Sequence, residues 1–321
     1  MNKPVKVNYV LFDLTNKCNL LCKHSYKTNN ITDKELDSDF CLSIFDELHR
    51  LYGTNNIVLS GGEPSLYSSL KELLDGIKHR EASVKFNTNG LILPPPIVDQ
   101  PYKNMRVQIS LDGYDRKSYK EIRGLDAFDK VCENAVQIKS AGLNVSFRTT
   151  ITKTNISNYM DFIELSEKLG IPIIMRPLMN TGVDSQSELA NSFEELINWK
   201  DEVIARGLIK YIGGEDFFTC TNCPLLCEES YISVLSVDVH GNAFPCSALR
   251  TDYLRLGNFY ESSVRDVIEN YYDVRDRIER VIRCEQCKKC GFRSSYGKGN
   301  CIVFCSFANK KCVLELMDKG I

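Results

Sequence analysis

The 321-residue sequence predicts an α/β fold: a partial β/α barrel of six units, followed by a small cysteine-rich α+β domain. Short β-branched runs alternate strictly with longer amphipathic stretches, which is typical of parallel strands joined by right-handed helical crossovers. Six such units are two short of the eight that close a barrel, and a doubly wound sheet is the alternative. The composition changes after about residue 215, so we place the barrel in residues 1–215 and the second domain in residues 216–321.

Periodicity gives the individual elements. The expected barrel strands are Val5–Leu14, Ile57–Ser60, Val84–Asn87, Arg106–Leu111, Asn144–Ile151 and Pro172–Pro177. Apolar residues at helical spacing predict a helix that starts with a capping box at Thr32 and runs through Leu51, and further helices at Phe128–Ile138, Ile156–Leu169 and Phe193–Ile204. The second domain is expected to contain a strand at Ile232–Val239, a turn at His240–Asn242 and a helix at Ser263–Val281. We expect Pro94–Pro96 to form a loop.

The charge balance and hydropathy exclude several classes of protein. Lys and Arg number 40 against 42 Asp and Glu, a net charge of −2 that offers no basic stripe for nucleic acid. No apolar run approaches the ~18 residues that span a bilayer. The apolar run near the start stops at Asp13, which argues against a secretory signal. We therefore expect a cytoplasmic protein with no nucleic-acid or membrane partner.

Cysteine is the unusual residue of the composition. The chain has 14 cysteines beside 4 histidines, and ten of the cysteines fall between Cys220 and Cys312. The cytosol keeps disulfides reduced, so thiolates bound to metal are the better interpretation of this cluster. Zinc and iron–sulfur clusters are both open at this point.

Four polar motifs follow four successive predicted strands. They are Cys18–Ser25, Ser60–Pro64, Asn87–Gly90 and Ile109–Gly113. Any one of them could be an ordinary turn, since Asn-Gly and Asp-Gly usually are. The carboxyl ends of parallel strands meet at one end of a barrel, where barrel enzymes build their active sites. Four motifs in the same position therefore indicate a functional site.

The motifs at residues 18–25 and 61–64 resemble those of the radical S-adenosylmethionine (SAM) superfamily. Its pattern is CxxxCxxC after the first strand and a GGEP-like turn after the second. The resemblance implies that thiolates hold three irons of a 4Fe–4S cluster, whose fourth iron binds SAM. Reductive cleavage of SAM then yields a 5′-deoxyadenosyl radical. Cys18 and Cys22 would be cluster ligands.

The same resemblance assigns the contacts of SAM. By matching position, His24 lies near the adenine, Gly61, Gly62 and Glu63 meet the amino group of the methionine, and Asn89, Ser110 and Arg123 contact the ribose or the carboxylate. Glycines allow close backbone approach, and a carboxylate pairs well with an ammonium.

Ser25 occupies the third cysteine position of the motif. A hydroxyl is far less acidic than a thiol and presents a hard oxygen, so it is a weak substitute for a thiolate. We therefore expect the SAM-binding cluster to be compromised. Three explanations are open: an engineered or recent Cys→Ser change, which we favour; natural loss in a pseudoenzyme; and weak ligation by serine.

The cysteines of the second domain resemble the SPASM extension of radical SAM enzymes, which carries two auxiliary 4Fe–4S clusters. By position, one cluster would use Cys223 or Cys220 with Cys227, Cys246 and Cys305, and the other would use Cys287, Cys290, Cys301 and Cys312. Cys220 and Cys284 are then surplus thiols, either hydrogen-atom donors or substrate-facing ligands, or residues that only pack or alternate as ligands. The spacing from Cys290 to Cys301 is longer than usual in the family, and a zinc ribbon is the chemical rival.

The resemblance implies an enzyme that modifies a ribosomally made peptide or protein, by a crosslink, thioether, epimerisation or oxidation. The alternative is a catalytically silent iron–sulfur protein. Expected partners are the peptide or protein substrate, a separate peptide-recognition protein and a flavodoxin- or ferredoxin-type reductant. Arg148 and Arg176 lie on predicted barrel strands. A charged side chain in the barrel mouth could bind a carboxylate, but a salt bridge across the site is an equal alternative.

Overall fold

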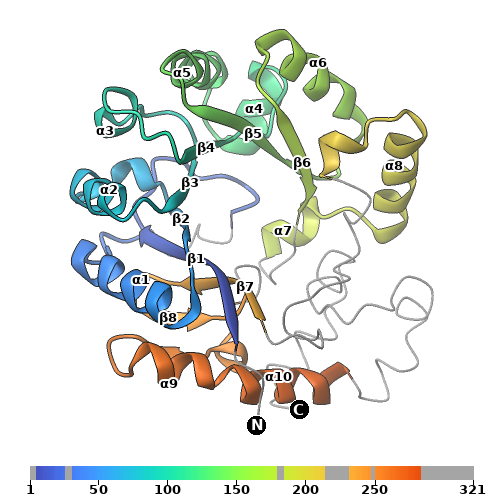
Figure 1. Cartoon of the computed structure of the whole chain (residues 1–321). Coiled ribbons are helices and arrows are strands. Elements are labelled where there is room, and N and C mark those ends of the chain that lie inside the picture. Colours follow the sequence, from blue (N-terminus) through green and yellow to red (C-terminus); the bar gives the residue numbers. More distant parts are fainter. Residues whose placement is uncertain (1–4, 26–30, 179–183, 214–230, 247–249, 283–321) are drawn as a thin grey trace.

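The parallel sheet predicted from the sequence is present and curved. The computed structural model describes residues 5–25, 31–178, 184–213, 231–246 and 250–282. Within them, nine strands form one sheet in the order β6-β5-β4-β3-β2-β1-β7-β8-β9. Figure 1 shows this sheet curving round an interior without closing. The expectation of a partial, open barrel is confirmed.

Strands β1 to β7 agree with the sequence expectation to within a residue or two, and β8 and β9 had no counterpart in it. They are β1 (Lys6–Thr15), β2 (Asn56–Gly61), β3 (Ser83–Thr88), β4 (Met105–Ser110), β5 (Asn144–Ile151), β6 (Ile173–Pro177), β7 (Tyr231–Val237), β8 (Asn242–Phe244) and β9 (Gly257–Asn258). Neighbours from β6 round to β7 pair in parallel, and β8 and β9 add antiparallel. Strand β7 extends the sheet at the free edge of β1.

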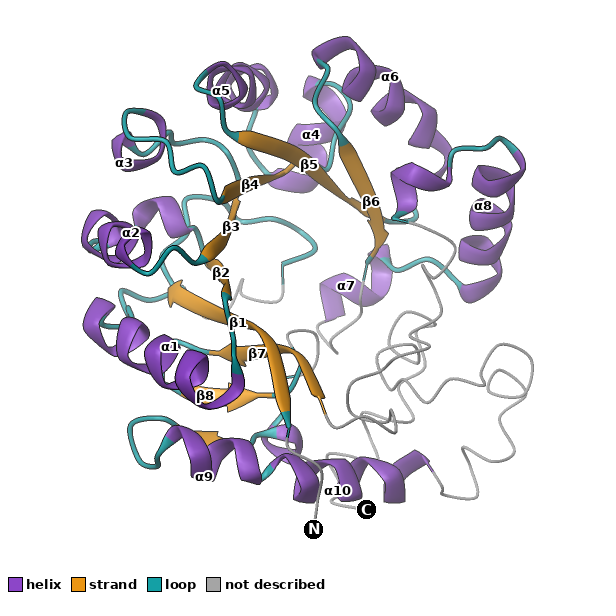
Figure 2. Ribbon diagram, in the orientation of Figure 1, coloured by secondary structure: helices purple, strands orange, loops and turns teal. Residues whose placement is uncertain are grey.

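Helices cover the outer side of the curved sheet, as Figure 2 shows for α1, α2, α5 and α6. The α-helices are α1 (Ser38–Tyr52), α2 (Leu70–His79), α3 (Pro95–Val98), α4 (Arg116–Arg123), α5 (Phe128–Ser140), α6 (Tyr159–Leu169), α7 (Asp184–Leu189), α8 (Phe193–Ala205), α9 (Val264–Glu269) and α10 (Tyr271–Ile282). Single 3₁₀ turns lie at η1 (Pro64–Leu66), η2 (Ile156–Asn158), η3 (Ile209–Ile212) and η5 (Asp252–Leu254). Within the described ranges, no helix combines the length and apolar character needed to cross a membrane.

The start of α1 differs from the expectation. The helix is capped by Asp37, whose carboxylate accepts a hydrogen bond from the Phe40 amide at 2.8 Å, and not by Thr32. The preceding segment is held extended against β1, because the Leu36 amide donates to the Leu14 carbonyl and Glu35 forms a bridge with Thr15. Tertiary pairing therefore overrides the local capping signal.

Two other elements also differ. Pro95 begins a short helix, α3, in place of the expected loop; a proline is tolerated in the first turn because that turn needs no amide donor. The expected helix Ser263–Val281 is divided at Asn270 into α9 and α10. The Asn270 side chain donates to the Leu256 carbonyl at 2.8 Å, which fixes the break. Helices α2, α4 and α7 had no counterpart in the sequence prediction.

The two faces of the barrel strands carry different side chains. On β3, Val84 and Phe86 are buried in the hydrophobic core under the helices. Successive side chains alternate in a strand, so Lys85 and Asn87 face the barrel interior. This alternation places polar and charged residues around the interior and positions the site.

Candidate functional site

A cavity of about 380 Å³ lies at the carboxyl ends of strands β1 to β5. Its lining residues are Cys18, Leu20, Cys22, His24, Ser25, Ser60, Gly61, Gly62, Glu63, Asn87, Thr88, Asn89, Gln108, Ser110, Arg123, Arg148 and Thr150. They include every residue that the sequence resemblance places around SAM and its cluster. The structure thus brings these residues together, and their individual roles stay predictions.

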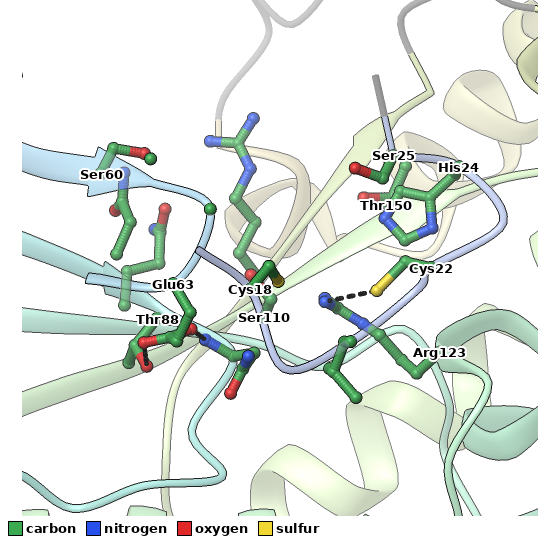
Figure 3. Close-up of a pocket in the computed structure, with 17 residues that line it drawn as sticks. Cys18, Cys22, His24, Ser25, Ser60, Glu63, Thr88, Ser110, Arg123 and Thr150 are labelled. Atoms are coloured by element: carbon green, nitrogen blue, oxygen red, sulfur yellow. Dashed lines mark hydrogen bonds between the residues drawn. The ribbon is translucent and has the colours of Figure 1, made fainter. Parts of the chain in front are cut away.

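The loop after β1 presents the two thiols and the serine to the cavity, as Figure 3 shows. Cys22 is 7% exposed, and the Ser25 amide donates to the Cys22 carbonyl at 3.0 Å. The Lys23 amide donates to the Ile122 carbonyl at 3.0 Å, which ties the loop to α4. The loop is therefore anchored on both sides of its second cysteine.

This donor set fits a 4Fe–4S cluster only in part. Two thiols and one hydroxyl face the cavity where the family pattern needs three thiolates. Burial raises the pKa of both Cys18 and Cys22, which favours the protonated thiols, and a bound metal ion would displace these protons. Across the described part of the chain, no three His, Cys, Asp or Glu side chains meet to hold a metal ion.

The Gly-Gly-Glu turn after β2 packs directly on the cysteine loop. The Gly62 amide donates to the Thr15 carbonyl at 2.7 Å, and the Glu63 amide donates to the Lys17 carbonyl at 2.8 Å. An added Cβ at Gly62 would lie 2.2 Å from the Lys17 carbonyl oxygen. Glycine is therefore required here for close approach of two backbones.

The carboxylate of Glu63 is buried, at 1% exposure, and fixed by hydrogen bonds. It accepts from the Thr88 hydroxyl at 2.6 Å, the Asn89 amide at 2.6 Å and the Ser65 amide at 3.0 Å. Figure 3 shows Thr88 beside Glu63. A fixed carboxylate at a cavity wall is suited to an ammonium group. Sequence reasoning gave Thr88 no role, although it belongs to the quoted Asn87–Gly90 motif.

A second buried carboxylate, Asp112, organises the other side of the cavity. Arg123 Nη2 lies 2.5 Å from Asp112 Oδ2, and His24 Nε2 lies 3.3 Å from the same oxygen. Burial opposes ionisation, but the charge of Arg123 holds the pKa of Asp112 below its usual value. Arg123 Nη1 also lies 3.5 Å from the Cys22 sulfur, so this group links the cysteine loop to β4. Sequence reasoning gave Asp112 no role, although it belongs to the quoted Ile109–Gly113 motif.

His24 is held between the cysteine loop and its neighbours. The backbone carbonyl of His24 accepts a hydrogen bond from the side-chain amide of Gln186 at 3.0 Å. Burial, and secondarily the charge of Arg123, lowers the pKa of His24 against the opposing effect of Asp112. A neutral imidazole at the cavity wall is suited to stacking on an uncharged ring such as adenine.

The predicted auxiliary-cluster ligands can be followed only at Cys246, which is half-buried just after β8. The remaining ligand candidates Cys223, Cys227, Cys287, Cys290, Cys301, Cys305 and Cys312, and the surplus thiols Cys220 and Cys284, lie outside the described residues. Their assignment stays a prediction.

Comparison with known families decides the identity of the first domain. The model of the radical SAM superfamily matches residues 12–179. The chain belongs to the radical SAM superfamily. The SPASM model, an iron–sulfur cluster-binding domain, matches residues 227–291 of this radical SAM protein. SAM and 4Fe–4S clusters are thus the cofactors of the two domains.

Relatives of this radical SAM protein include curated enzymes. The mycofactocin maturase MftC of Mycolicibacterium smegmatis is 24% identical over 306 residues, covering 91% of this chain and 77% of the relative. The MftC of Mycobacterium tuberculosis strain H37Rv is 26% identical over 309 residues, with the same coverage. A probable GTP 3′,8-cyclase of Saccharolobus solfataricus is 32% identical, but over only 49% of this chain.

Solved structures share the fold. Streptococcus suis SuiB bound to SAM superimposes with a TM-score of 0.73 at 17% identity, covering 93% of this chain and 73% of SuiB. The anSMEcpe protein with bound AdoMet gives a TM-score of 0.67 at 15% identity, covering 98% of this chain and 96% of that protein. At such identities the likeness shows the fold alone.

Proposed function

We propose that this radical SAM/SPASM protein is a maturase that modifies a ribosomally made peptide or protein. The observation that carries the proposal is the cavity that joins the cysteine loop, the Gly-Gly-Glu turn and Ser110 at the carboxyl ends of neighbouring strands. MftC, a maturase by name, supports the substrate class, as does SuiB, whose structure is known with its precursor peptide SuiA.

The chemistry at this cavity would be hydrogen-atom abstraction. Bound SAM and its cluster would supply a deoxyadenosyl radical able to abstract a hydrogen atom from a C–H bond of the peptide. The chain's own residues would position the cofactor: Glu63 would hold the amino group, and His24 would border the adenine. The products of such chemistry would be a crosslink, a thioether, an epimerised residue or an oxidised side chain, and auxiliary clusters in the second domain would carry electrons or bind substrate.

Ser25 impairs this activity, because a hydroxyl stands where the CxxxCxxC motif has its third thiolate. We expect Ser25→Cys to increase SAM cleavage by at least about tenfold, since even outer-sphere partners of a metal site are worth 10–100-fold. The measurement is 5′-deoxyadenosine formed under dithionite after anaerobic reconstitution with iron and sulfide.

Ser43→Cys is the matched control, because it adds one cysteine at an exposed position on α1, outside the cavity. Equal 5′-deoxyadenosine from the original chain and Ser25→Cys would contradict the impairment. Ser25→Ala separates the remaining alternatives: a further loss of activity indicates ligation by serine.

The alternative function, a catalytically silent iron–sulfur protein, is favoured by Ser25 itself. Iron analysis distinguishes the two. Three 4Fe–4S clusters correspond to about 12 iron atoms per chain, and two auxiliary clusters alone to about 8. If Ser25→Cys binds about 12 iron atoms and still fails to cleave SAM, the maturase proposal is wrong.

A further inference from the structure

Two cations face the barrel interior from strands that also line the cavity. Lys85 lies on β3 two residues before Asn87, which lines the cavity, so the two side chains share the inner face. Arg148 lies on β5 two residues before Thr150, and both residues line the cavity. Arg176, on β6, pairs in register with Thr150 and therefore also faces inward. Figure 2 shows β3 to β6 as successive strands of the curved wall.

Strands β3 and β5 flank β4 in the sheet, so the inward side chains of Lys85 and Arg148 belong to one stretch of the barrel wall. Burial, together with the charges of Arg148, Arg176 and Arg106, lowers the pKa of Lys85 to about 8. Burial and the charge of Arg176 also lower the pKa of Arg148, against the opposing charge of Asp112. The side chain of Arg148 is exposed and borders the cavity, and that of Lys85 is half-buried. The inner face of β3 to β6 therefore carries a group of positive charges that a ligand in the cavity can reach.

The described residues provide no carboxylate within ion-pair distance of Lys85 or Arg148. The sequence left open whether Arg148 makes a salt bridge across the site, and within the described ranges it makes none. The inward carboxylates nearby already have partners: Asp112 pairs with Arg123, and Asp13 pairs with Arg250.

Glu63 is similarly engaged, since both of its carboxylate oxygens accept hydrogen bonds, among them those of Thr88 and Asn89 at the carboxyl end of β3. Like charges gathered on one wall repel one another. An anion of the ligand would relieve this repulsion, and a carboxylate would accept charge-assisted hydrogen bonds from either side chain. The site thus has the chemistry of a receptor for carboxylates.

We propose that Lys85 and Arg148 form a carboxylate-binding cluster that selects peptides with an acidic side chain or a free carboxyl terminus close to the modified residue. The proposal rests on the proposed function, because it names the class of peptide that the maturase accepts. The carboxylate of SAM is the competing ligand. Lys85 does not line the SAM cavity itself but lies further toward the amino end of its strand, which favours the peptide.

The test is calorimetric binding of short peptides to the full, anaerobically reconstituted chain with saturating SAM. The acidic probe is acetyl-Gly-Glu-Gly-Glu-Gly-amide and the neutral probe is acetyl-Gly-Gln-Gly-Gln-Gly-amide. A third probe, acetyl-Gly-Gln-Gly-Gln-Gly with a free carboxyl terminus, separates the terminal carboxylate from the side-chain carboxylate. We expect one of the two carboxylate probes to bind about tenfold tighter than the neutral probe, the factor that one charge-assisted contact supports.

Substitutions test whether the preference for a carboxylate probe depends on Lys85 and Arg148. Lys85→Met and Arg148→Met should each weaken the preferred probe about five- to tenfold and leave the neutral probe unchanged. Lys85→Arg keeps the charge and should retain binding, which controls for misfolding. Lys103→Met, at an exposed lysine in the loop before β4, should have no effect.

Three results would overturn the proposal: no preference for either carboxylate probe, an equal loss for acidic and neutral probes in Lys85→Met, or weaker SAM binding in Lys85→Met. SAM cleavage by Ser25→Cys, measured in parallel, separates this failure from that of the proposed function. If Ser25→Cys cleaves SAM but no carboxylate preference is found, only the proposed class of substrate is wrong. If a carboxylate preference is found but Ser25→Cys does not cleave SAM, the maturase proposal is wrong and the carboxylate-binding proposal is supported.

Discussion

The pKa of Lys85 differs between the folded and the unfolded chain. Burial and the neighbouring arginines lower its pKa from 10.5 to about 8 in the fold, whereas the ordinary value applies after unfolding. Between about pH 8 and 10.5 the unfolded chain binds more protons, so this residue makes stability rise with pH. Below pH 8 both states are charged, and the full cost of the buried charge is present. Above about pH 10.5 the cost is absent.

Lys85→Met should therefore stabilise the fold at pH 7, by about 1 to 3 kcal/mol after a discount for solvent screening of a half-buried group. The gain should shrink as the pH rises from 8 to 10. Urea unfolding of both proteins at pH 7 and pH 10 measures the difference. Lys103→Met serves as the exposed control, and a gain for Lys85→Met that is independent of pH would contradict the assignment.

The residues that sequence could identify are those whose motif is contiguous. Cys18, Cys22 and Glu63 stand in short runs that resemble the motifs of the radical SAM family, and the resemblance implies their chemistry. Asp112 and Lys85 could not be recognised in the same way, because their roles depend on partners from other strands. Arg123, at the end of α4, pairs with Asp112, which follows β4, and Lys85 on β3 is affected by the charge of Arg148 on β5.

At the scale of elements, the turn after β2 and the loop after β1 form one unit through backbone contact. Gly62 is the point of closest approach, and its backbone φ lies outside the positive range, so alanine would be conformationally acceptable there. The added Cβ would nevertheless meet the backbone of Lys17 at 2.2 Å. A backbone atom cannot swing aside as a flexible side chain can, so the two segments must separate.

Gly62→Ala should therefore displace the turn from the cysteine loop, weaken SAM binding at least about tenfold and lower the unfolding free energy by about 1 to 3 kcal/mol, a typical cost of overpacking. Calorimetric SAM binding and urea unfolding measure the two effects. Gly207→Ala is the control: its φ of 70° carries backbone strain, but nothing lies within 4 Å of its added Cβ. It should lose stability and keep SAM affinity. Normal SAM affinity in Gly62→Ala would contradict the close-packing argument.

Elements were predictable where the hydrophobic period is unambiguous. The six barrel strands follow this period, and Asn144–Ile151 is the same in sequence expectation and structure. Element ends depend on partners that local sequence does not contain. Thr32 offers an adequate cap, but pairing of Glu35 with β1 delays the helix to Ser38. The break at Asn270 likewise depends on a hydrogen bond to Leu256, fourteen residues away.

At the scale of the whole molecule, the sheet joins distant parts of the chain. Strand β7, from the second predicted domain, pairs with β1 in parallel, with Val10 opposite Leu235 and Phe12 opposite Val237. Sequence reasoning placed a domain boundary near residue 215 because the composition changes there, and composition carries no information about strand pairing. Pairing covers the edge that β1 would otherwise expose. The barrel and the strand after the boundary should therefore unfold together.

Leu235→Ala tests this coupling. Leu235 is fully buried, at 0% exposure, and its truncation should cost about 2 to 5 kcal/mol. If β1 and β7 belong to one cooperative unit, hydrogen exchange will show the slow amides of β1 and β2 losing the same protection free energy as those of β7. Val136→Ala, at a 39% exposed position on α5, is the matched control and should change protection by less than about 0.5 kcal/mol. If only the amides of β7, β8 and β9 lost protection, these strands would unfold separately from the barrel. The barrel would then be stable with β1 as an edge strand.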